Sequence, residues 1–311
     1  GERIAVAGTG GESGAGEVVV RDTTSGEQTT LDAGLGADTV QAVRFSPDGS
    51  MLAVAAFGDG VRVWDVASGK VLTPILARAG RVIGPIAWRP DGSGLVAQAV
   101  DETSRIGVWD PRTGQHRRWL GDPADEMAYS LAYDGSRLAV GRIDGSVALW
   151  DTAAGKRLFR STAHRDAAGA DAGAVPVVVA LSDRLLASAS QYDNSLRLYH
   201  RGDGSAAGRI TDRTRSSDSS AAAQGPTIMT FSGDGTTLLT ATGGRVMVWD
   251  PVERTRLGRL AGGTGGGTTG GRTIAALAVT ADAATTVAAR IGGRVVDWRR
   301  GTPWYETPRG S

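Results

Sequence analysis

The sequence predicts an all-β fold built from one small unit that recurs along the whole chain. Two observations carry this prediction. Short apolar runs end again and again in Trp-Asp or a close variant, and an Asp-Gly turn lies upstream of several of them. The runs have the length of strands and lie between turn residues, which is typical of β-structure. A fixed period along the whole chain indicates a repeat architecture.

The recurring signature is a strand that ends in Trp-Asp, first complete in FGDGVRVWD at 57–65. Seven copies follow one another at spacings of 43, 45, 41, 49, 50 and 49 residues. The copies at 22 and 299 are weaker than the others. The residues at the Trp position are Arg21, Trp64, Trp109, Trp150, Tyr199, Trp249 and Trp298.

Each unit contains more than its signature. In the second unit an apolar run and a tight turn, VQAVRFSPDGS at 40–50, precede the strand MLAVAAF. The Trp-Asp strand comes next, and KVLTPIL follows as a fourth. Asp-Gly suits a hairpin turn because glycine takes a positive φ cheaply and aspartate can bond the turn backbone. One unit is therefore predicted to be four short antiparallel strands.

A sheet of this size cannot bury both faces alone, but sheets placed around an axis cover one another. The pattern resembles the WD-repeat β-propeller family over essentially the full length. The resemblance implies a seven-bladed β-propeller of four-stranded antiparallel blades, a single domain over residues 1–311. The blades are expected at approximately residues 1–35, 36–79, 80–122, 123–163, 164–213, 214–262 and 263–311.

The resemblance also implies a role for the recurring Trp. In the family it joins a hydrogen-bonded set with a His before the first strand, a Ser or Thr on the second and an Asp before the third. A buried indole N–H needs such an acceptor. Only the segment STAHRD supplies a matching His here. The expected set is His164, Ser188 or Ser190, Asp193 and Tyr199.

The first blade is expected to lack its innermost strand. RIAVAG, EVVVRD and EQTTL supply its second, third and fourth strands, and residues 304–307 are expected as the fourth strand of the last blade. We expect the absent strand to lie upstream in a longer polypeptide. The alternative is a partner that donates a strand to the open edge.

Asp297 departs from the pattern because blades two and six carry Val63 and Val248 at its position. An ionised carboxylate on an inner strand face is costly unless it is paired. We expect Asp297 to reach solvent or an arginine such as Arg290 or Arg3. A functional carboxylate is the alternative.

Four long connectors, 8–16, 161–174, 211–226 and 261–272, are expected on one face of the propeller. Loops on a rigid scaffold carry binding groups, so this face is the candidate site. Neutral drift in Gly-, Ser- and Ala-rich loops is the competing interpretation. The residues expected to contact a partner are Arg81, Tyr129, Arg142, His164 and Arg272.

Composition argues against most site chemistry. The chain has no cysteine, which excludes thiol nucleophiles and cysteine-bound metals, and its three histidines have no metal-like spacing. Gly265, Gly267 and Gly270 satisfy a nucleotide-binding spacing, but an apolar β-run follows where that motif needs a helix. We predict no catalytic residue, no cofactor and no metal. An axial ligand-binding or hydrolytic site is the alternative.

Arginine clusters such as RRWLGD at 117–122 raise the possibility of nucleic-acid binding. Acidic residues are interspersed, however, and the formal net charge is only +1. We therefore interpret the clusters as solvated sheet edges and predict neither a nucleic-acid nor a membrane partner. A nucleic-acid-binding propeller remains the second alternative.

The function that fits best is a non-enzymatic scaffold or sensor domain that binds a protein or peptide. Arginine greatly outnumbers lysine and Asn194 is the only asparagine, a bias typical of G+C-rich bacterial genomes. The resemblance extends to C-terminal propellers of bacterial multidomain signalling or defence proteins. It implies an upstream effector domain in the same polypeptide. We separately predict a cytoplasmic location.

Overall fold

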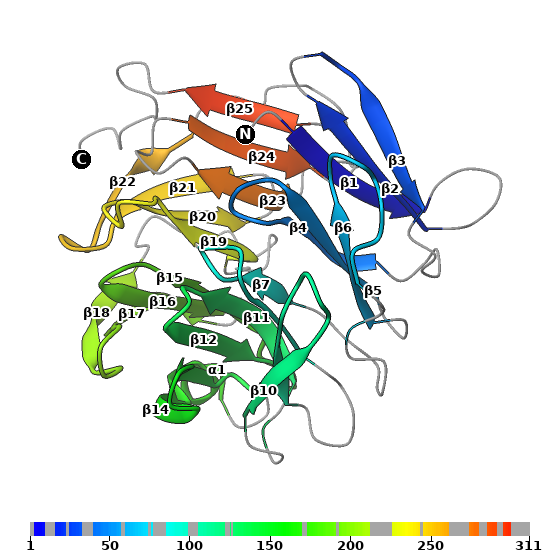
Figure 1. Ribbon diagram of the computed structural model, residues 1–311. Helices are drawn as coiled ribbons and strands as arrows, with labels where there is room; N and C mark the ends of the chain where they lie inside the picture. Colours follow the sequence, from blue (N-terminus) through cyan, green and yellow to red (C-terminus); the bar gives the residue numbers. More distant parts are fainter. Residues whose placement is uncertain are drawn as a thin grey trace. The chain divides into compact units, whose positions relative to one another are not determined.

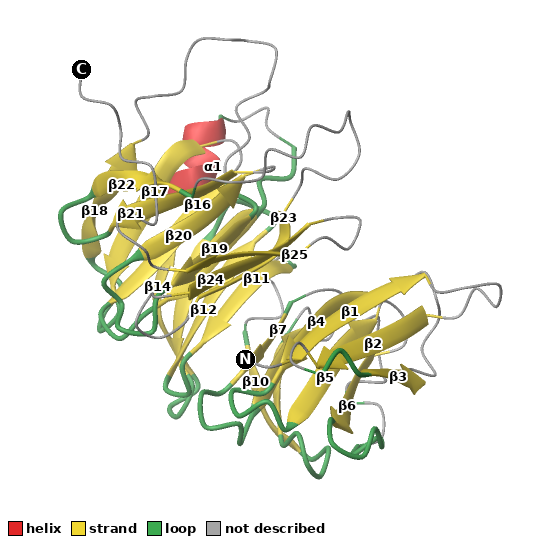
Figure 2. Ribbon diagram, turned by 90° about the horizontal axis from the view of Figure 1, so that it is seen from above, coloured by secondary structure: helices red, strands yellow, loops and turns green. Residues whose placement is uncertain are grey.

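The computed structural model describes residues 3–9, 16–22, 25–32, 40–56, 60–73, 76, 85–98, 105–121, 125, 127–169, 173–190, 193–211, 226–242, 245–260, 274–279, 285–290 and 295–299. The described residues form antiparallel sheets, with α1 (Ala163–Ala168) as their one helix (Figure 1). The predicted all-β class is therefore confirmed. Figure 2 shows the short helix α1 among the strands. Within the described residues, no helix is long and apolar enough to span a membrane.

The chain divides into two compact units, residues 1–138 with 150–157 and residues 139–149 with 158–311. The first unit holds three complete sheets, built from β1 (Arg3–Thr9), β2 (Gly16–Asp22), β3 (Gln28–Asp32), β4 (Val40–Phe45), β5 (Met51–Ala56), β6 (Gly60–Asp65), β7 (Ile86–Trp88), β8 (Leu95–Gln98), β9 (Ile106–Trp109) and β10 (His116–Leu120).

The division between the units runs through one sheet, made of β11 (Ala128–Tyr133), β12 (Arg137–Arg142), β13 (Val147–Asp151) and β14 (Lys156–Ser161). The second unit holds the remaining sheets, built from β15 (Val177–Leu181), β16 (Leu185–Ser190), β17 (Asp193–His200), β18 (Ala206–Thr211), β19 (Ile228–Phe231), β20 (Leu238–Thr242), β21 (Arg245–Asp250), β22 (Thr255–Arg259), β23 (Ile274–Val279), β24 (Thr285–Arg290) and β25 (Val295–Arg299).

Strands pair in sequence order within each sheet, as hairpins joined by tight turns require. The sheet β1-β2-β3 contains the three strands that the sequence predicts for the first blade. In the sheet β4-β5-β6 the described residues of the predicted fourth strand KVLTPIL pair antiparallel with β6, and Leu72 N–H donates to the Val63 carbonyl at 2.8 Å. Among those described residues, the ladder consists of two isolated bridges, Val61 with Leu76 and Trp64 with Val71.

The predicted fourth strand at 304–307 lies outside the described residues. Asp297 lies in β25 opposite Val287 of β24, and its side chain falls outside the description, so its expected partners stay a prediction.

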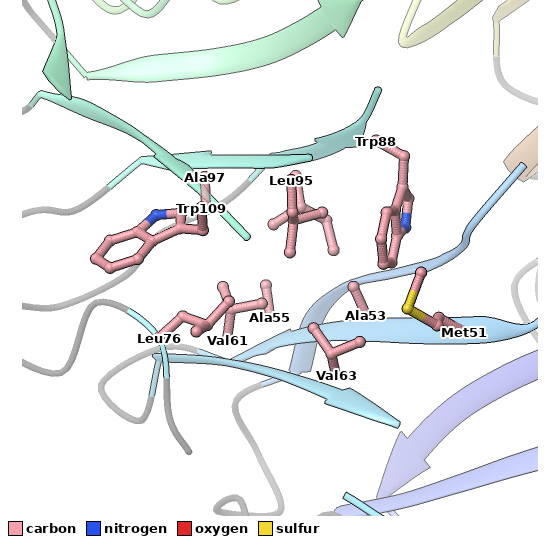
Figure 3. Close-up of a cluster of buried hydrophobic side chains, with 11 residues drawn as sticks. Met51, Ala53, Ala55, Val61, Val63, Leu76, Trp88, Leu95, Ala97 and Trp109 are labelled. Carbon is pink, nitrogen blue, oxygen red and sulfur yellow. The ribbon is translucent and has the colours of Figure 1, made fainter. Parts of the chain in front are cut away.

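Strand β5 shows how neighbouring sheets share a core in the first unit. All six of its residues are buried. Leu52, Val54 and Ala56 join a cluster with Val18 of β2, whereas Met51, Ala53 and Ala55 face a second cluster with Leu95 and Trp109 (Figure 3). Successive side chains of a strand point to opposite faces, so β5 is covered on both sides. Full burial of each aliphatic side chain stabilises the fold by about 1.5–3 kcal/mol.

The second unit repeats this arrangement. Leu196 and Leu198 of β17 pack with Phe231 and Trp249 of the next sheet, and Leu239 and Val248 pack with Ile274 of β23. Each of these sheets therefore depends on its neighbour for part of its core.

The signature tryptophans differ in how their indole N–H is satisfied. Trp249 donates to Thr240 Oγ1 at 2.9 Å, the contact that the family resemblance implies for a second-strand threonine. In the sheet of β7 to β10, Trp109 pairs with Leu95, and Ala97 stands at the position equivalent to Thr240, so the buried indole nitrogen of Trp109 has no partner among the described residues. Its ring lies over Gly107, where a Cβ would come within 2.5 Å of Nε1. Glycine thus permits a position that leaves this donor unsatisfied.

The Asp-Gly turns are closed by side chains, as predicted. Asp48 accepts from the Ser46 hydroxyl at 2.5 Å and from the Ser50 hydroxyl at 2.8 Å, while Gly49 has φ +72°. Hydrogen bonds from Ser46 first, and then from Ser50, lower the pKa of Asp48 from 3.8 to about 2. The turn before β5 therefore prefers the ionised carboxylate.

We predict that Thr240→Val destabilises the protein by about 1–3 kcal/mol, because the buried indole N–H of Trp249 loses its acceptor while the side-chain shape is kept. The measurement is the free energy of unfolding in urea. Thr255→Val makes the same chemical change at an exposed position of β22 and should cost far less. Equal losses from the two substitutions would refute the role given to Thr240.

We predict that Asp48→Asn changes how stability depends on acid pH. Because the folded-state pKa of Asp48 is lowered, its ionisation stabilises the fold fully above pH 3.8, and this contribution is lost as pH falls towards 2. The variant lacks the contribution, so its deficit in urea unfolding midpoint should shrink over that pH window. A deficit that does not vary with pH would contradict the assignment.

Candidate functional site

The connector 161–174, predicted as a loop on the candidate face, contains the helix α1. The backbone N–H of Asp166 donates to the carbonyl of Thr162, and Ala163 N–H donates to the Ser161 hydroxyl. Alanines favour the helical turn, and Gly169 ends it with φ +89°. The helix itself was not predicted, because six residues are too few for a periodic apolar pattern.

The buried His164 holds α1 against the sheet β15-β16-β17-β18. Its Nε2 lies 2.8 Å from Ser188 Oγ of β16, and both side chains are fully buried. Arg197 of β17 donates to the Ala163 carbonyl at 3.0 Å. Two strands of the sheet therefore reach the helix through polar contacts inside the protein, where hydrogen bonds are most costly to break.

A tight turn, residues 143–146 between β12 and β13, packs against the same helix. Asp144 accepts from Ser146 N–H at 2.8 Å and pairs with Arg160 at 3.3 Å. Gly145 has φ +86°, and a Cβ there would come within 2.7 Å of the Arg165 backbone nitrogen. Only glycine fits this close approach. We call α1 together with this turn the α1 surface.

Around the anchored core of the α1 surface, several groups remain accessible. Thr162, Asp166 and Ala167 are exposed, and Arg165 is half-buried with Nη1 donating to the Gly173 carbonyl at 2.9 Å. The surface thus combines a rigid base with a small set of exposed polar and apolar groups.

Of the four residues expected to form one hydrogen-bonded set, two are in contact in the structure. His164 and Ser188 are in contact, whereas the Tyr199 hydroxyl lies 3.4 Å from Ser161 Oγ and its ring packs on Phe159. Asp193 begins β17, but its side chain falls outside the description. Membership of Asp193 in the set stays a prediction.

Of the five residues expected to contact a partner, the described ones differ in their exposure to solvent. Tyr129 is 45% exposed near the start of β11. Arg142 and His164 are both fully buried, which removes them from a contact surface. The physical reason for Arg142 is that β12 is covered on both faces to its last residue. Arg81 and Arg272 lie outside the described residues, so their contacts remain predictions.

The shifted pKa values of titratable groups among the described residues follow from burial and from hydrogen bonds in turns. No group of three or more His, Asp or Glu among those residues could hold a metal ion. Burial raises the pKa of Asp110, but hydrogen bonds from Arg117 and two backbone N–H groups outweigh it and bring the pKa to about 2. Burial lowers the pKa of His116. The shifted carboxylates lie in hairpin turns rather than together in a site.

Comparison with known proteins agrees with this architecture. Residues 28–65 match the family described as "WD domain, G-beta repeat". The COMPASS component SWD3 of Saccharomyces cerevisiae is 26% identical over 50% of this chain and 47% of its own length. Autophagy-related protein 16 of Arabidopsis thaliana is 29% identical over 51% of this chain and 30% of its own length. The chain therefore spans about half, or less, of these relatives.

Solved structures extend the likeness to almost the whole chain. A chain of the mitotic checkpoint complex superposes with a TM-score of 0.72 and 21% identity, covering 96% of this chain and 83% of that one. The computationally designed Ika8 protein gives 0.70 and 19%, covering 96% and 81%. These neighbours show the β-propeller fold, and the sequence matches support the WD-repeat family.

We predict that Gly145→Ala loosens α1 and costs about 1–3 kcal/mol, because the added Cβ meets the Arg165 backbone and φ is strained. Gly169→Ala is the matched control, with φ +89° but nothing within 4 Å of the new Cβ. Amide hydrogen exchange across 161–169 should speed up more for the first variant. Equal exchange in the two variants would contradict the packing of the turn on α1.

Proposed function

From the premise of a WD-repeat propeller, we propose that this chain is a non-enzymatic scaffold that recognises a protein or peptide, and that the α1 surface makes the contact. WD-repeat proteins are typically scaffolds for protein interaction, and their propellers typically bind protein partners. The one described contact between a histidine and a serine hydroxyl that the site contains, His164 with Ser188, is fully buried and therefore does not offer an accessible nucleophile.

One observation carries the choice of the α1 surface. The helix is anchored by His164 and Arg197 from within, while Asp166 and Ala167 stay exposed. A loop that is already ordered loses little conformational entropy on binding, so a few exposed groups can contribute net affinity. Specificity then depends on those groups rather than on the buried area.

Tyr129 is a second proposed contact, separate from the α1 surface, because a half-exposed tyrosine offers a large apolar area and a hydroxyl at low entropic cost. We further propose that the scaffold serves a larger bacterial signalling or defence protein in the cytoplasm, with an effector domain upstream. The resemblance and the composition support that context.

We predict that peptides selected from a display library on the purified chain lose about tenfold or more in affinity on the double variant Asp166→Arg and Ala167→Arg, because it adds charge and bulk to the α1 surface. Titration of fluorescent peptides measures the loss. Glu253→Arg, an exposed position in the β21–β22 turn, controls for added positive charge and should bind normally.

The proposal fails if no selected peptide distinguishes the wild type from the α1-surface variant. Circular dichroism melting of all variants is the folding control, and each should melt like the wild type, because Asp166 and Ala167 are exposed and the contact of Asp166 with Thr162 lies at the surface.

A further inference from the structure

The β9–β10 hairpin, residues 105–121, carries an unusual local charge. It contains four arginines, Arg105, Arg112, Arg117 and Arg118, against the single carboxylate Asp110. The outer hairpin of the first sheet, residues 16–32, has the opposite balance, with four carboxylates and one arginine. The positive charge is confined to the hairpin itself, because the acidic residues Asp122, Asp125 and Glu126 follow it directly in the sequence.

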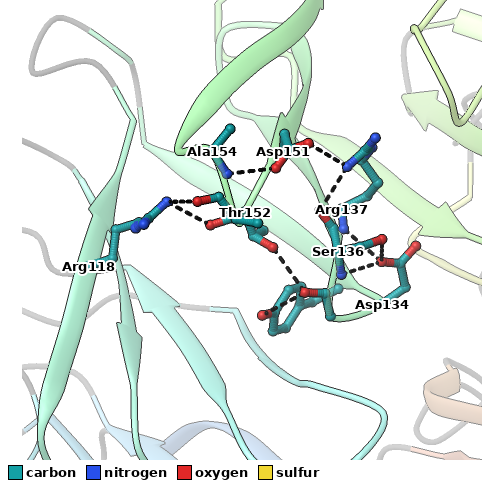
Figure 4. Close-up of polar contacts among 10 residues, drawn as sticks. Arg118, Asp134, Ser136, Arg137, Asp151, Thr152 and Ala154 are labelled. Atoms are coloured by element: carbon teal, nitrogen blue, oxygen red, sulfur yellow. Dashed lines mark hydrogen bonds and ion pairs between the residues drawn. The ribbon is translucent and has the colours of Figure 1, made fainter.

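The arginines of this hairpin are held in place before any partner arrives. Arg118 donates to the carbonyls of Thr152, at 3.0 Å, and Ala153 in the β13–β14 turn (Figure 4). Carbonyl oxygens orient the guanidinium without neutralising it. Arg117 pairs with Asp110 at 2.5 Å and keeps its side chain 46% exposed, so this ion pair is open to solvent.

An aromatic cluster supports the same hairpin. Trp119 meets the buried Trp109 edge to face at 5.9 Å, and His116 packs between them with its ring 4.3 Å from Trp119. The Arg105 guanidinium lies over the Trp119 ring at 5.0 Å, a cation–π contact that restrains it. Trp119 is only partly buried, so the hairpin offers an apolar area beside its charges.

The positive charge of this surface comes from arginine and is insensitive to pH near neutrality. Burial lowers the pKa of His116, a hydrogen bond with the Arg118 backbone opposes that effect, and the charge of Arg105 adds to the lowering. Guanidinium groups stay protonated throughout. Arginine also matches carboxylate geometry with two parallel hydrogen bonds.

Strand β10 is the outermost strand of its sheet and pairs only with β9 among the described residues. Charged side chains and bulges are a common means of keeping edge strands from pairing, and the register does shift between His116 and Arg118. That protection explains charge on the edge. It does not explain why the arginines are oriented by carbonyls and an indole, which points to recognition through side chains.

We propose that Arg105, Arg117, Arg118 and Trp119, along the edge strand β10, form a docking surface for an acidic, extended peptide segment of a partner protein. Arg118 pairs with Val108 and Trp119 with Gly107, so their side chains leave opposite faces of the sheet and the segment would run along the edge between them. The carboxylates of the segment pair with the guanidiniums, and its apolar residues contact Trp119. This surface belongs to the first unit and does not depend on the α1 surface, although it rests on the proposed role in protein recognition. A nucleic acid is less suitable because the basic region does not extend along the chain.

The test uses the full chain and a fluorescent decapeptide in which glutamate alternates with leucine or valine. Anisotropy at about 0.15 M salt should show binding that weakens at about 1 M salt. Arg117→Gln with Arg118→Gln should weaken binding roughly tenfold. Arg256→Gln with Arg259→Gln on β22, the outer strand of another sheet, is the matched control and should bind like the wild type. A Trp119→Leu variant should weaken the leucine-containing peptide more than an all-glutamate one.

Several outcomes would overturn the proposal. These are no binding of the peptide, equal losses in both double variants, or tighter binding of a labelled single-stranded oligonucleotide of the same length. Dimerisation of the chain that the Arg117 and Arg118 variant abolishes would instead assign the surface to a second copy. Because α1-surface variants are not used, failure here leaves the proposed function to its own test.

Discussion

The described structure depends on one constraint, which is that a sheet of three or four short strands cannot cover both of its own faces. In β5 every side chain is buried, and the two alternating sets of three belong to two different clusters. In the second unit Leu239 and Val248 play the same part between neighbouring sheets. Apolar surface on each sheet is removed from water only by the next sheet, so the stability of each repeat is shared with its neighbours.

Burial imposes a second requirement, because every donor carried into these cores needs an acceptor. Trp249 meets it through Thr240, and His164 lies within hydrogen-bonding distance of Ser188. Trp109 does not meet it among the described residues, and its indole rests over Gly107 instead. The repeats thus share their strand arrangement but differ in whether the buried tryptophan N–H has a hydrogen-bond acceptor. Among the described residues, Trp249 makes the contact that the family resemblance implies and Trp109 does not.

The same division between buried anchors and accessible groups organises both candidate surfaces. At the α1 surface a buried histidine fixes a helix whose outer residues are exposed. At the β9–β10 hairpin, carbonyls and an indole orient arginines that remain accessible. In each case the sheets hold a few side chains in fixed positions, and those side chains are the groups that a partner would contact. A partner that binds such a surface does not have to order it first.

The sequence by itself determined the strands, their hairpin turns and the repeat, because these depend on local patterns such as SPDGS and the Trp-Asp signature. It also determined where the arginines of 105–121 lie along the chain. Tertiary structure alone decided that α1 is helical, that Val71 and Leu76 meet β6 as isolated bridges and that Arg142 is buried. Those outcomes depend on which segments meet in space. A local pattern records the preference of a residue, whereas its burial and partners follow from neighbours that are distant in sequence.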